Sequence, residues 1–253
     1  MISKIFIIQS LKKSDYKSGE ELSKKLSSII TSVSFLNAET DAEMFAELDR
    51  IKLEITKKIG QYIIHFDCHG NKSGIGIYDK SDNLFFLSWE DLRDKLREIY
   101  VASNQKAIIS FSSCEGFNVA KLVAQFKPCP FYLITGSFSK ISFVDSVNGY
   151  FLFYRNLINN KKIQDNVAEI RTTFPTLNFV VFDNTQLVII AWNGYINLEL
   201  TPNKIKERKD AIKTEIIQLT GKITKEQERY LDKQFTLAAT EEHFKKFKEV
   251  FFS

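Results

Sequence analysis

The sequence has little cysteine and no long apolar run, and these two shortages exclude several classes of protein. Its 253 residues include three cysteines, which is too few and an odd number for a disulfide framework. We therefore expect free thiols and a reducing, cytoplasmic compartment. The first apolar run, residues 5–8, is too short for a signal-peptide core or a membrane span, so we expect no membrane association.

Proline, glycine and an excess of charge of one sign are also scarce. Four prolines and ten glycines argue against a disordered or fibrous chain. The net charge is only +4, from 35 basic and 31 acidic residues, and this small excess does not favour a nucleic-acid partner. What is present, 44% hydrophobic and 26% charged residues, is typical of a folded protein with a substantial core.

Short apolar runs alternate with amphipathic helical patterns over the first 160 residues. Such alternation predicts a mostly parallel sheet with helices on both faces, a three-layer α/β/α sandwich. Helices are expected around 17–30, from a capping box at 40–43 to Gly60, from Ser88 onward, over 117–126 and over 143–159. The predicted strands are 4–10, 32–40, 62–70, 106–114 and 129–137, with a hairpin over 74–88.

The pattern changes after residue 160. Residues 177–200 read as two or three strands without helices between them, which predicts an antiparallel addition to the sheet. From Asn203 the chain is charged and helical, and Thr240 is a candidate cap for a last helix with a phenylalanine-rich face. We expect a domain over 1–200 and a C-terminal helical extension over 201–253.

Two predicted strands end in residues that can support nucleophilic catalysis. His69 and Cys114 each lie at a strand end. Ligands of open α/β sheets bind outside the carboxyl ends of the strands, so neighbouring strands would bring both side chains to one edge. A thiolate attacks a carbonyl carbon while a nearby imidazole manages the protons. We therefore predict a catalytic dyad of His69 and Cys114.

Glycines beside both residues fit the same chemistry. Gly70 follows His69, and Gly116 lies two residues after Cys114, which permits sharp turns and the close approach of a ligand. The backbone amides of Gly70 and Cys114 are our candidates for an oxyanion hole.

These motifs resemble those of the caspase-like cysteine peptidases of clan CD, and within them the CHAT group. A strand ending in His-Gly (HFDCHG, 65–70) precedes a strand ending in Ser-Cys-x-Gly (SCEG, 113–116). His69 precedes Cys114 by 45 residues, close to the interval of about 50 in caspases. Residues 143–171 also resemble a block of the CHAT group, so that the likeness covers residues 1–190.

The resemblance implies a caspase-like fold and a cysteine endopeptidase that cleaves protein substrates without a cofactor, with His69 as base and Cys114 as nucleophile. It also implies a regulated bacterial effector in antiviral defence or programmed death, switched on by a protein partner. Caspases proper have Gln-Ala-Cys-x-Gly, and metacaspases place an aspartate where this chain has Ser112. Neither aspartate nor arginine specificity is therefore implied.

Four further polar residues are candidates for supporting roles. Asp67 shares a strand face with His69 and could orient it. His65 lies within the apolar strand and is interpreted as a hydrogen-bonded core or supporting residue. Asp145 follows the fifth strand and could bind a basic substrate side chain, although an aspartate is also favoured at a helix N-terminus. Glu115, next to the nucleophile, is a second substrate-binding candidate.

Metal and redox sites are weaker hypotheses. His65, Cys68, His69 and Cys114 have the right ligand chemistry for zinc, but they lack the paired spacing of structural zinc sites. No two cysteines form a C-x-x-C motif, which excludes a thioredoxin-like pair. We expect no metal.

Two other functional classes stay open. A caspase-like fold that keeps both residues could be a silent scaffold or binding module that uses the C-terminal helices as its interface. A flavodoxin-like nucleotide or signalling domain would need a phosphate loop. The glycine pattern at 70–76 is weak and precedes a hairpin rather than a helix.

Overall fold

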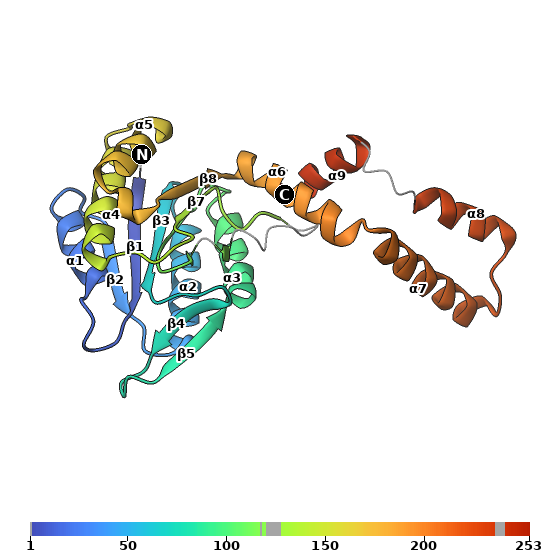
Figure 1. Ribbon diagram of the computed structural model, residues 1–253, viewed down its shortest axis with the longest axis horizontal. Helices are drawn as coiled ribbons and strands as arrows, with labels where there is room; N and C mark the ends of the chain where they lie inside the picture. The colour runs from blue at the N-terminus through green and yellow to red at the C-terminus, as the bar shows by residue number, and fades with distance from the viewer. Residues whose placement is uncertain (1, 117, 120–127, 236–240) are drawn as a thin grey trace. The chain divides into compact units, whose positions relative to one another are not determined.

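The computed structural model describes residues 2–116, 118–119, 128–235 and 241–253, and it contains a six-stranded sheet (Figure 1). The strand order is β2-β1-β3-β6-β7-β8, with β8 antiparallel to β7 and all other pairs parallel. A separate antiparallel hairpin joins β4 to β5. The strands are β1 (Ile2–Ser10), β2 (Val33–Asn37), β3 (Gln61–Cys68), β4 (Gly74–Tyr78), β5 (Leu84–Ser88), β6 (Ile108–Ser112), β7 (Leu133–Gly136) and β8 (Val180–Asp183).

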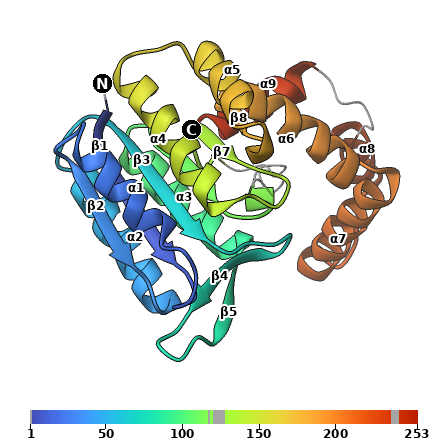
Figure 2. The same cartoon turned by 60° about the vertical axis from the view of Figure 1, so that its left-hand side comes forward.

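Helices cover both faces of this sheet, as Figure 2 shows. On one face α4 contacts α1 and α5, and α2 contacts α3 on the other. The predicted three-layer α/β/α sandwich is confirmed. The helices of the layers are α1 (Ser18–Ser27), α2 (Asp41–Ile55), α3 (Trp89–Ala102), α4 (Phe143–Ile158) and α5 (Ile163–Thr173), and a short 3₁₀ helix covers Pro175–Leu177.

Alternate residues of each strand supply the two apolar layers. Ile63 and Ile108 belong to a buried cluster with residues of α1, α4 and α5. On the other face of the sheet, the Phe66 ring stacks on the Phe111 ring. Phe111 in turn contacts Trp89 of α3 edge-on. Because both faces are covered, the strands read as nearly continuous apolar runs, which is why they are recognisable in the sequence.

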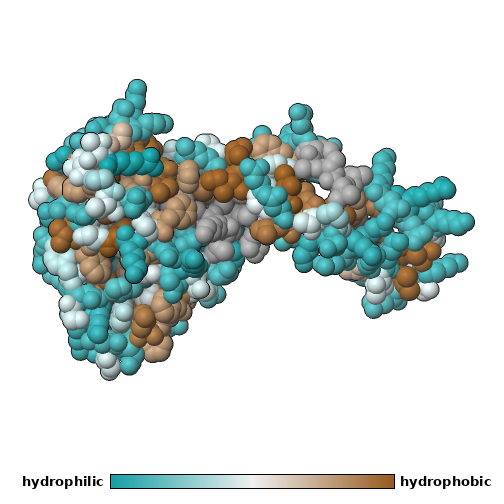
Figure 3. All heavy atoms as spheres, viewed as in Figure 1, coloured by the Kyte–Doolittle hydropathy of each residue, from teal (hydrophilic) through white to brown (hydrophobic). Residues whose placement is uncertain are grey.

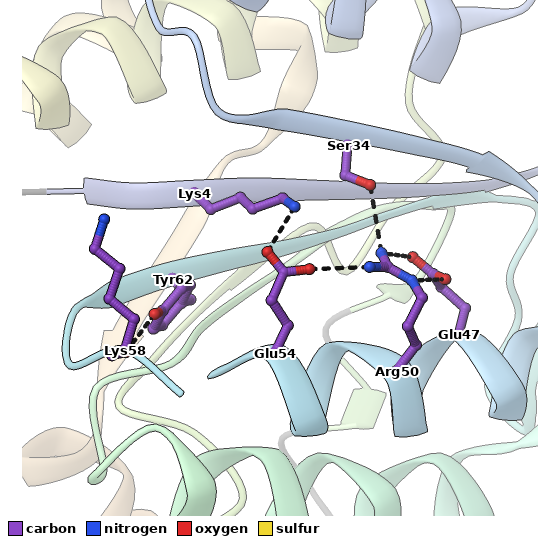
Figure 4. Close-up of polar contacts among 7 residues, drawn as sticks. All are labelled: Lys4, Ser34, Glu47, Arg50, Glu54, Lys58 and Tyr62. Carbon is purple, nitrogen blue, oxygen red and sulfur yellow. Dashed lines mark hydrogen bonds and ion pairs between the residues drawn. The ribbon is translucent and has the colours of Figure 1, made fainter. Parts of the chain in front are cut away.

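A network of charged side chains holds α2 against the first halves of β1 and β2 (Figure 4). The Arg50 guanidinium lies 2.6 Å from a Glu47 oxygen and 2.9 Å from a Glu54 oxygen, and the Lys4 ammonium lies 2.7 Å from Glu54. The two cations also lie over the Phe6 ring. The hydrogen bond from Lys4, with Arg50 nearby, lowers the pKa of the Glu54 carboxyl. The charges of this network are therefore paired with one another.

The segment 177–200 differs from its prediction. β8 adds to the sheet in antiparallel fashion as expected, but the two or three strands predicted there reduce to this one, and a helix, α6 (Asn184–Glu199), follows directly. Its residues have high β-propensity, yet Leu187, Val188 and Ala191 recur at helical spacing and are buried, while Ile189 and Ile190 are exposed. Burial of one helical face decides the local structure.

The chain forms two compact units, which divide between Leu187 and Val188. The division lies within α6 rather than at the expected boundary of 200 and 201. Helices α7 (Pro202–Thr220), α8 (Lys225–Gln234) and α9 (Glu241–Phe251) follow in the second unit. There the Trp192 ring centroid lies 5.3 Å from those of Phe244 and Phe247.

Two predictions fall outside the described residues, namely most of the helix over 117–126 and the capping role of Thr240. Within the described parts of the chain, no helix is long and apolar enough to cross a lipid bilayer.

Candidate active site

The predicted dyad lies at the carboxyl edge of the sheet, beside the point where the strand order reverses. From β1 the chain adds β2 on one side, and β3, β6 and β7 on the other. The crevice between β1 and β3 is therefore a topological switch point, where open α/β sheets bind ligands.

The pairing of β3 with β6 brings the segments that carry His69 and Cys114 to the same edge of the sheet. β3 and β6 pair in parallel with Asp67 opposite Ser112, and the dyad residues each follow two positions later. The segments stay close beyond the strands, since a Cβ atom on Gly70 would lie 2.6 Å from the Cys114 carbonyl oxygen. Glycine at position 70 is therefore required for this approach.

The backbone N–H of Gly70 is not used in the pairing with the adjacent strand β4. Gly70 forms an isolated antiparallel bridge with Ile75. The two hydrogen bonds of this bridge are donated by Gly76 to the His69 carbonyl, at 2.8 Å, and by Asn71 to the Gly74 carbonyl, at 3.0 Å. In such a widely spaced pair the N–H of the central residue points away from the partner strand. This leaves the amide directed away from β4.

The three thiols differ in exposure. Cys68 and Cys129 are buried, whereas Cys114 is partly exposed, and all three are free. Burial raises the pKa of the Cys68 thiol well above its usual value and that of Cys129 to about 12. A thiolate is accordingly disfavoured at the two buried positions.

The His69 ring is held by a carboxylate that the sequence did not indicate. Its Nε2 atom lies 2.9 Å from Oδ2 of Asp15, in the loop between β1 and α1. The same oxygen accepts a hydrogen bond from the Lys12 amide at 3.0 Å, and the Asp15 amide donates to the Lys12 carbonyl at 3.0 Å. This turn fixes the carboxylate beside Nε2 of the His69 ring.

Aromatic rings flank the imidazole. The ring of Tyr78 in β4 lies 5.5 Å from that of His69, and the ring of Phe143 at the start of α4 lies 5.8 Å from it, both edge-on. Partial burial and the nearby Asp15 and Asp82 carboxylates raise the pKa of the Tyr78 phenol. The phenol therefore stays protonated at neutral pH, and the imidazole lies between two aromatic rings and the Asp15 carboxylate.

Asp67 occupies a different position from the one expected of an orienting residue. Its carboxylate accepts a 2.7 Å hydrogen bond from Ser18 at the N-terminus of α1, rather than contacting the ring nitrogen that Asp15 holds. Burial raises its pKa to about 6, although the Ser18 hydrogen bond and His69 act in the opposite direction. Asp67 thus links β3 to α1 beneath the dyad.

His65 is a core residue. It is buried, its Nδ1 atom lies 2.7 Å from the Tyr154 hydroxyl oxygen, and its ring contacts Tyr150 edge-on at 4.7 Å. Burial lowers its pKa to about 3, so the ring is neutral at physiological pH. This agrees with its interpretation as a hydrogen-bonded core histidine.

The two substrate-binding candidates lie near the same edge. Asp145, in the first turn of α4, accepts a 2.7 Å hydrogen bond from the Thr176 hydroxyl. Glu115 has a left-handed backbone with a φ of 56°, and its amide donates to the Ser139 carbonyl at 3.3 Å. Left-handed backbone is unfavourable for a residue with a side chain, so the turn after Cys114 stores some strain.

Among the described residues, no group of three or more His, Cys, Asp or Glu side chains is arranged to hold a metal ion.

Three neighbours of the His69 ring were not indicated by the sequence. Asp15, Tyr78 and Phe143 lie in no motif that marks them. The switch-point rule, applied to the loop after β1 as it was to those after β3 and β6, would have drawn attention to Asp15.

Comparisons with known proteins leave the family open. No protein-family model matches the chain, and no curated protein matches it. Among solved structures, the chain is similar to Raptor of Chaetomium thermophilum, with 10% sequence identity and a TM-score of 0.33. The match covers 53% of this chain and 15% of that one, so the chain spans a small part of the other protein's length.

Proposed function

We propose that this chain is a cysteine endopeptidase that hydrolyses protein substrates with Cys114 as nucleophile and His69 as acid and base. The observation that carries the proposal is the parallel pairing of β3 and β6, which supports a position for both residues at the same carboxyl edge of the sheet. The contact of Gly70 with the Cys114 carbonyl and the partial exposure of Cys114 support it.

The proposed reaction has two steps. The Cys114 thiolate attacks the scissile carbonyl carbon, and the tetrahedral intermediate expels the amine, which takes a proton from the His69 imidazolium. A water molecule, losing a proton to His69, then attacks the thioester and releases the acid and the thiol. The Gly70 and Cys114 amides stabilise the oxyanion in both steps. Asp15 positions the imidazole through its contact with Nε2.

The biological setting follows from the resemblance to the CHAT group. It is a bacterial, cytoplasmic effector in antiviral defence or programmed death, which a protein partner activates. Assays should therefore include candidate activators, because an effector held inactive at rest cleaves nothing without its signal.

Thiol labelling tests the dyad without a known substrate. We expect iodoacetamide to label Cys114 at neutral pH in the intact chain, with Cys68 and Cys129 as buried internal controls. His69→Ala should slow labelling of Cys114 strongly, and Asp15→Asn should slow it less. Equal, slow labelling of all three thiols in the folded chain would exclude an activated nucleophile.

A binding module without catalysis is the second candidate. Its support is the exposure of apolar residues on α7 and α8, where the exposed fractions are 45% for Ile217, 78% for Leu219 and 62% for Tyr230. Such residues are typical of an interaction surface. The labelling experiment distinguishes the two candidates, since a module needs no reactive thiol.

A further inference from the structure

The β4–β5 hairpin carries apolar side chains that the fold leaves uncovered. Leu84, Phe85 and Phe86 are consecutive, and their exposed fractions are 41%, 57% and 52%. Figure 3 shows hydrophobic surface in the region where Figure 1 draws this hairpin. Three exposed apolar residues in a row are unfavourable in water unless a ligand or partner covers them.

Strand pairing assigns these side chains to the two faces of the hairpin. Tyr78 pairs with Leu84, and Ile77 pairs with Phe85. Directly paired residues point to the same face, and successive residues point to opposite faces. Because the Tyr78 ring contacts His69, Leu84 belongs to the face beside the dyad, and Phe85 belongs to the other.

Gly76 shows how close Leu84 comes to the histidine. A Cβ atom on Gly76 would lie 2.7 Å from Cδ1 of Leu84 and 3.5 Å from Cβ of His69. The tip of Leu84 and the base of the His69 side chain therefore both border Gly76. Phe86, which pairs with Gly76, extends this apolar face and also borders a cavity on the opposite side of the hairpin.

Apolar residues also lie on the α4 side of the dyad. Phe143 contacts the His69 ring, and its neighbour Val144 is 55% exposed. The acid nearest to His69, Asp15, is already occupied by the imidazole and by the Lys12 amide. On the β4–β5 side and the α4 side, the neighbours of His69 therefore suit an uncharged, apolar group.

We propose that the face formed by Gly76, Tyr78, Leu84 and Phe86 is a substrate subsite that receives an aliphatic or aromatic side chain next to the scissile bond. This inference rests on the proposed function and specifies its substrate class. The substrate side chain would cover Leu84 and Phe86 and so remove exposed apolar surface from water on binding.

Two thiol-reactive probes with the same reactive group test the subsite. The chloromethyl ketones of N-acetyl-leucine and N-acetyl-aspartate each alkylate a thiolate, which displaces chloride. Each rate at Cys114 is divided by the rate with free glutathione, so that the remaining difference reports side-chain recognition. We expect the leucine probe to react faster with the wild-type chain. Leu84→Ser should lower the leucine-to-aspartate rate ratio about tenfold, the scale on which apolar pockets discriminate.

Phe85→Ser is the matched control, because Phe85 is also exposed and lies on the opposite face of the same strand. It should leave the ratio unchanged, and iodoacetamide should label Cys114 at the wild-type rate in both variants. A Leu84→Ser chain with the wild-type ratio, or an equal loss in Phe85→Ser, would overturn the subsite. If the wild-type chain reacts with neither probe nor iodoacetamide at Cys114, the proposed function itself fails and the subsite with it.

Discussion

The two ends of the sheet differ in how their polar side chains are paired. Near the first residues of β1, Lys4, Arg50 and Glu54 pair with one another, and their contacts hold α2 on the sheet. At the carboxyl end, one oxygen of the buried Asp67 and the hydroxyl oxygen of Ser113 have no hydrogen-bond partner among the described residues. Glu115, one of six described non-glycine residues with left-handed backbone, lies at the same end.

This difference agrees with the proposed position of the site at the carboxyl end. A buried polar atom without a partner costs about 1–3 kcal/mol, so a fold that only needed stability would pair it or replace it. Paired charges at one end maintain the structure, whereas the unpaired groups of Asp67 and Ser113 would be available to the ligand that we propose for the other end. The predictions below test whether substitutions at the two ends separate into effects on reactivity and effects on stability.

The largest effect is expected from His69→Ala at the carboxyl end. General acid–base catalysis contributes about 10²- to 10⁴-fold, so the rate of peptide hydrolysis should fall by that factor. The free energy of unfolding should change little, because the side chain is partly exposed. Initial rates with a peptide library and denaturant unfolding measure the two quantities. Arg50→Gln is the control at the other end, and an equal loss of rate there would contradict the separation.

Asp67→Asn tests the buried carboxyl beneath the dyad. Burial raises its pKa to about 6 from the ordinary 3.8, so the folded state binds a proton more tightly than the unfolded state. The protonated Asp67 carboxyl therefore stabilises the folded state fully below about pH 3.8. This stabilisation, about 3 kcal/mol, is lost as the pH rises through about 6.

The asparagine variant has no such titration. The difference in unfolding free energy between wild type and variant should shift by about 3 kcal/mol in favour of the variant between pH 3.5 and 7.5. Urea unfolding across this range measures it. If the difference in unfolding free energy is independent of pH, ionisation of Asp67 does not destabilise the folded state.

Tyr154→Phe tests the polar contact of the core histidine. The substitution removes the hydroxyl group that lies 2.7 Å from Nδ1 of His65 and leaves that buried nitrogen without its partner. We expect a loss of about 1–3 kcal/mol in unfolding free energy and no change in the labelling rate of Cys114. A change in labelling at unchanged stability would mean that His65 takes part in the chemistry.

The fold was largely predictable because of how its strands are buried. Runs such as residues 5–8 are apolar throughout, since both faces of the sheet are covered, and the side chains of Thr40 and Ser88 accept hydrogen bonds at the helix starts where they were predicted. α6 was missed because its β-branched residues favour strands locally, and only the burial of Leu187 and Ala191 reveals the helical face.

The residues of the candidate site could be predicted only in part. His69 and Cys114 follow from the rule that ligands bind at the carboxyl ends of strands, which requires only the order of elements. The partner of His69 does not follow from the sequence. Asp67 and Asp15 are both plausible there, and the choice depends on the path of the loop after β1 and on the N-terminus of α1, which binds Asp67 through Ser18.

The smallest effect is expected from the charged network at the amino end of the sheet. Arg50→Gln and Glu54→Gln each remove one partner of a 2.9 Å contact on the surface of α2, in which the two side chains are 46% and 36% exposed. Exposed ion pairs contribute about 0.2–1 kcal/mol, so the coupling energy from a double-mutant cycle should lie in this range and decrease in high salt. A coupling of several kcal/mol, or one that salt does not change, would mean that the network is shielded from solvent. Labelling of Cys114 should be the same in all four chains, because the network contacts α2, β1 and β2 at the end of the sheet farthest from the dyad.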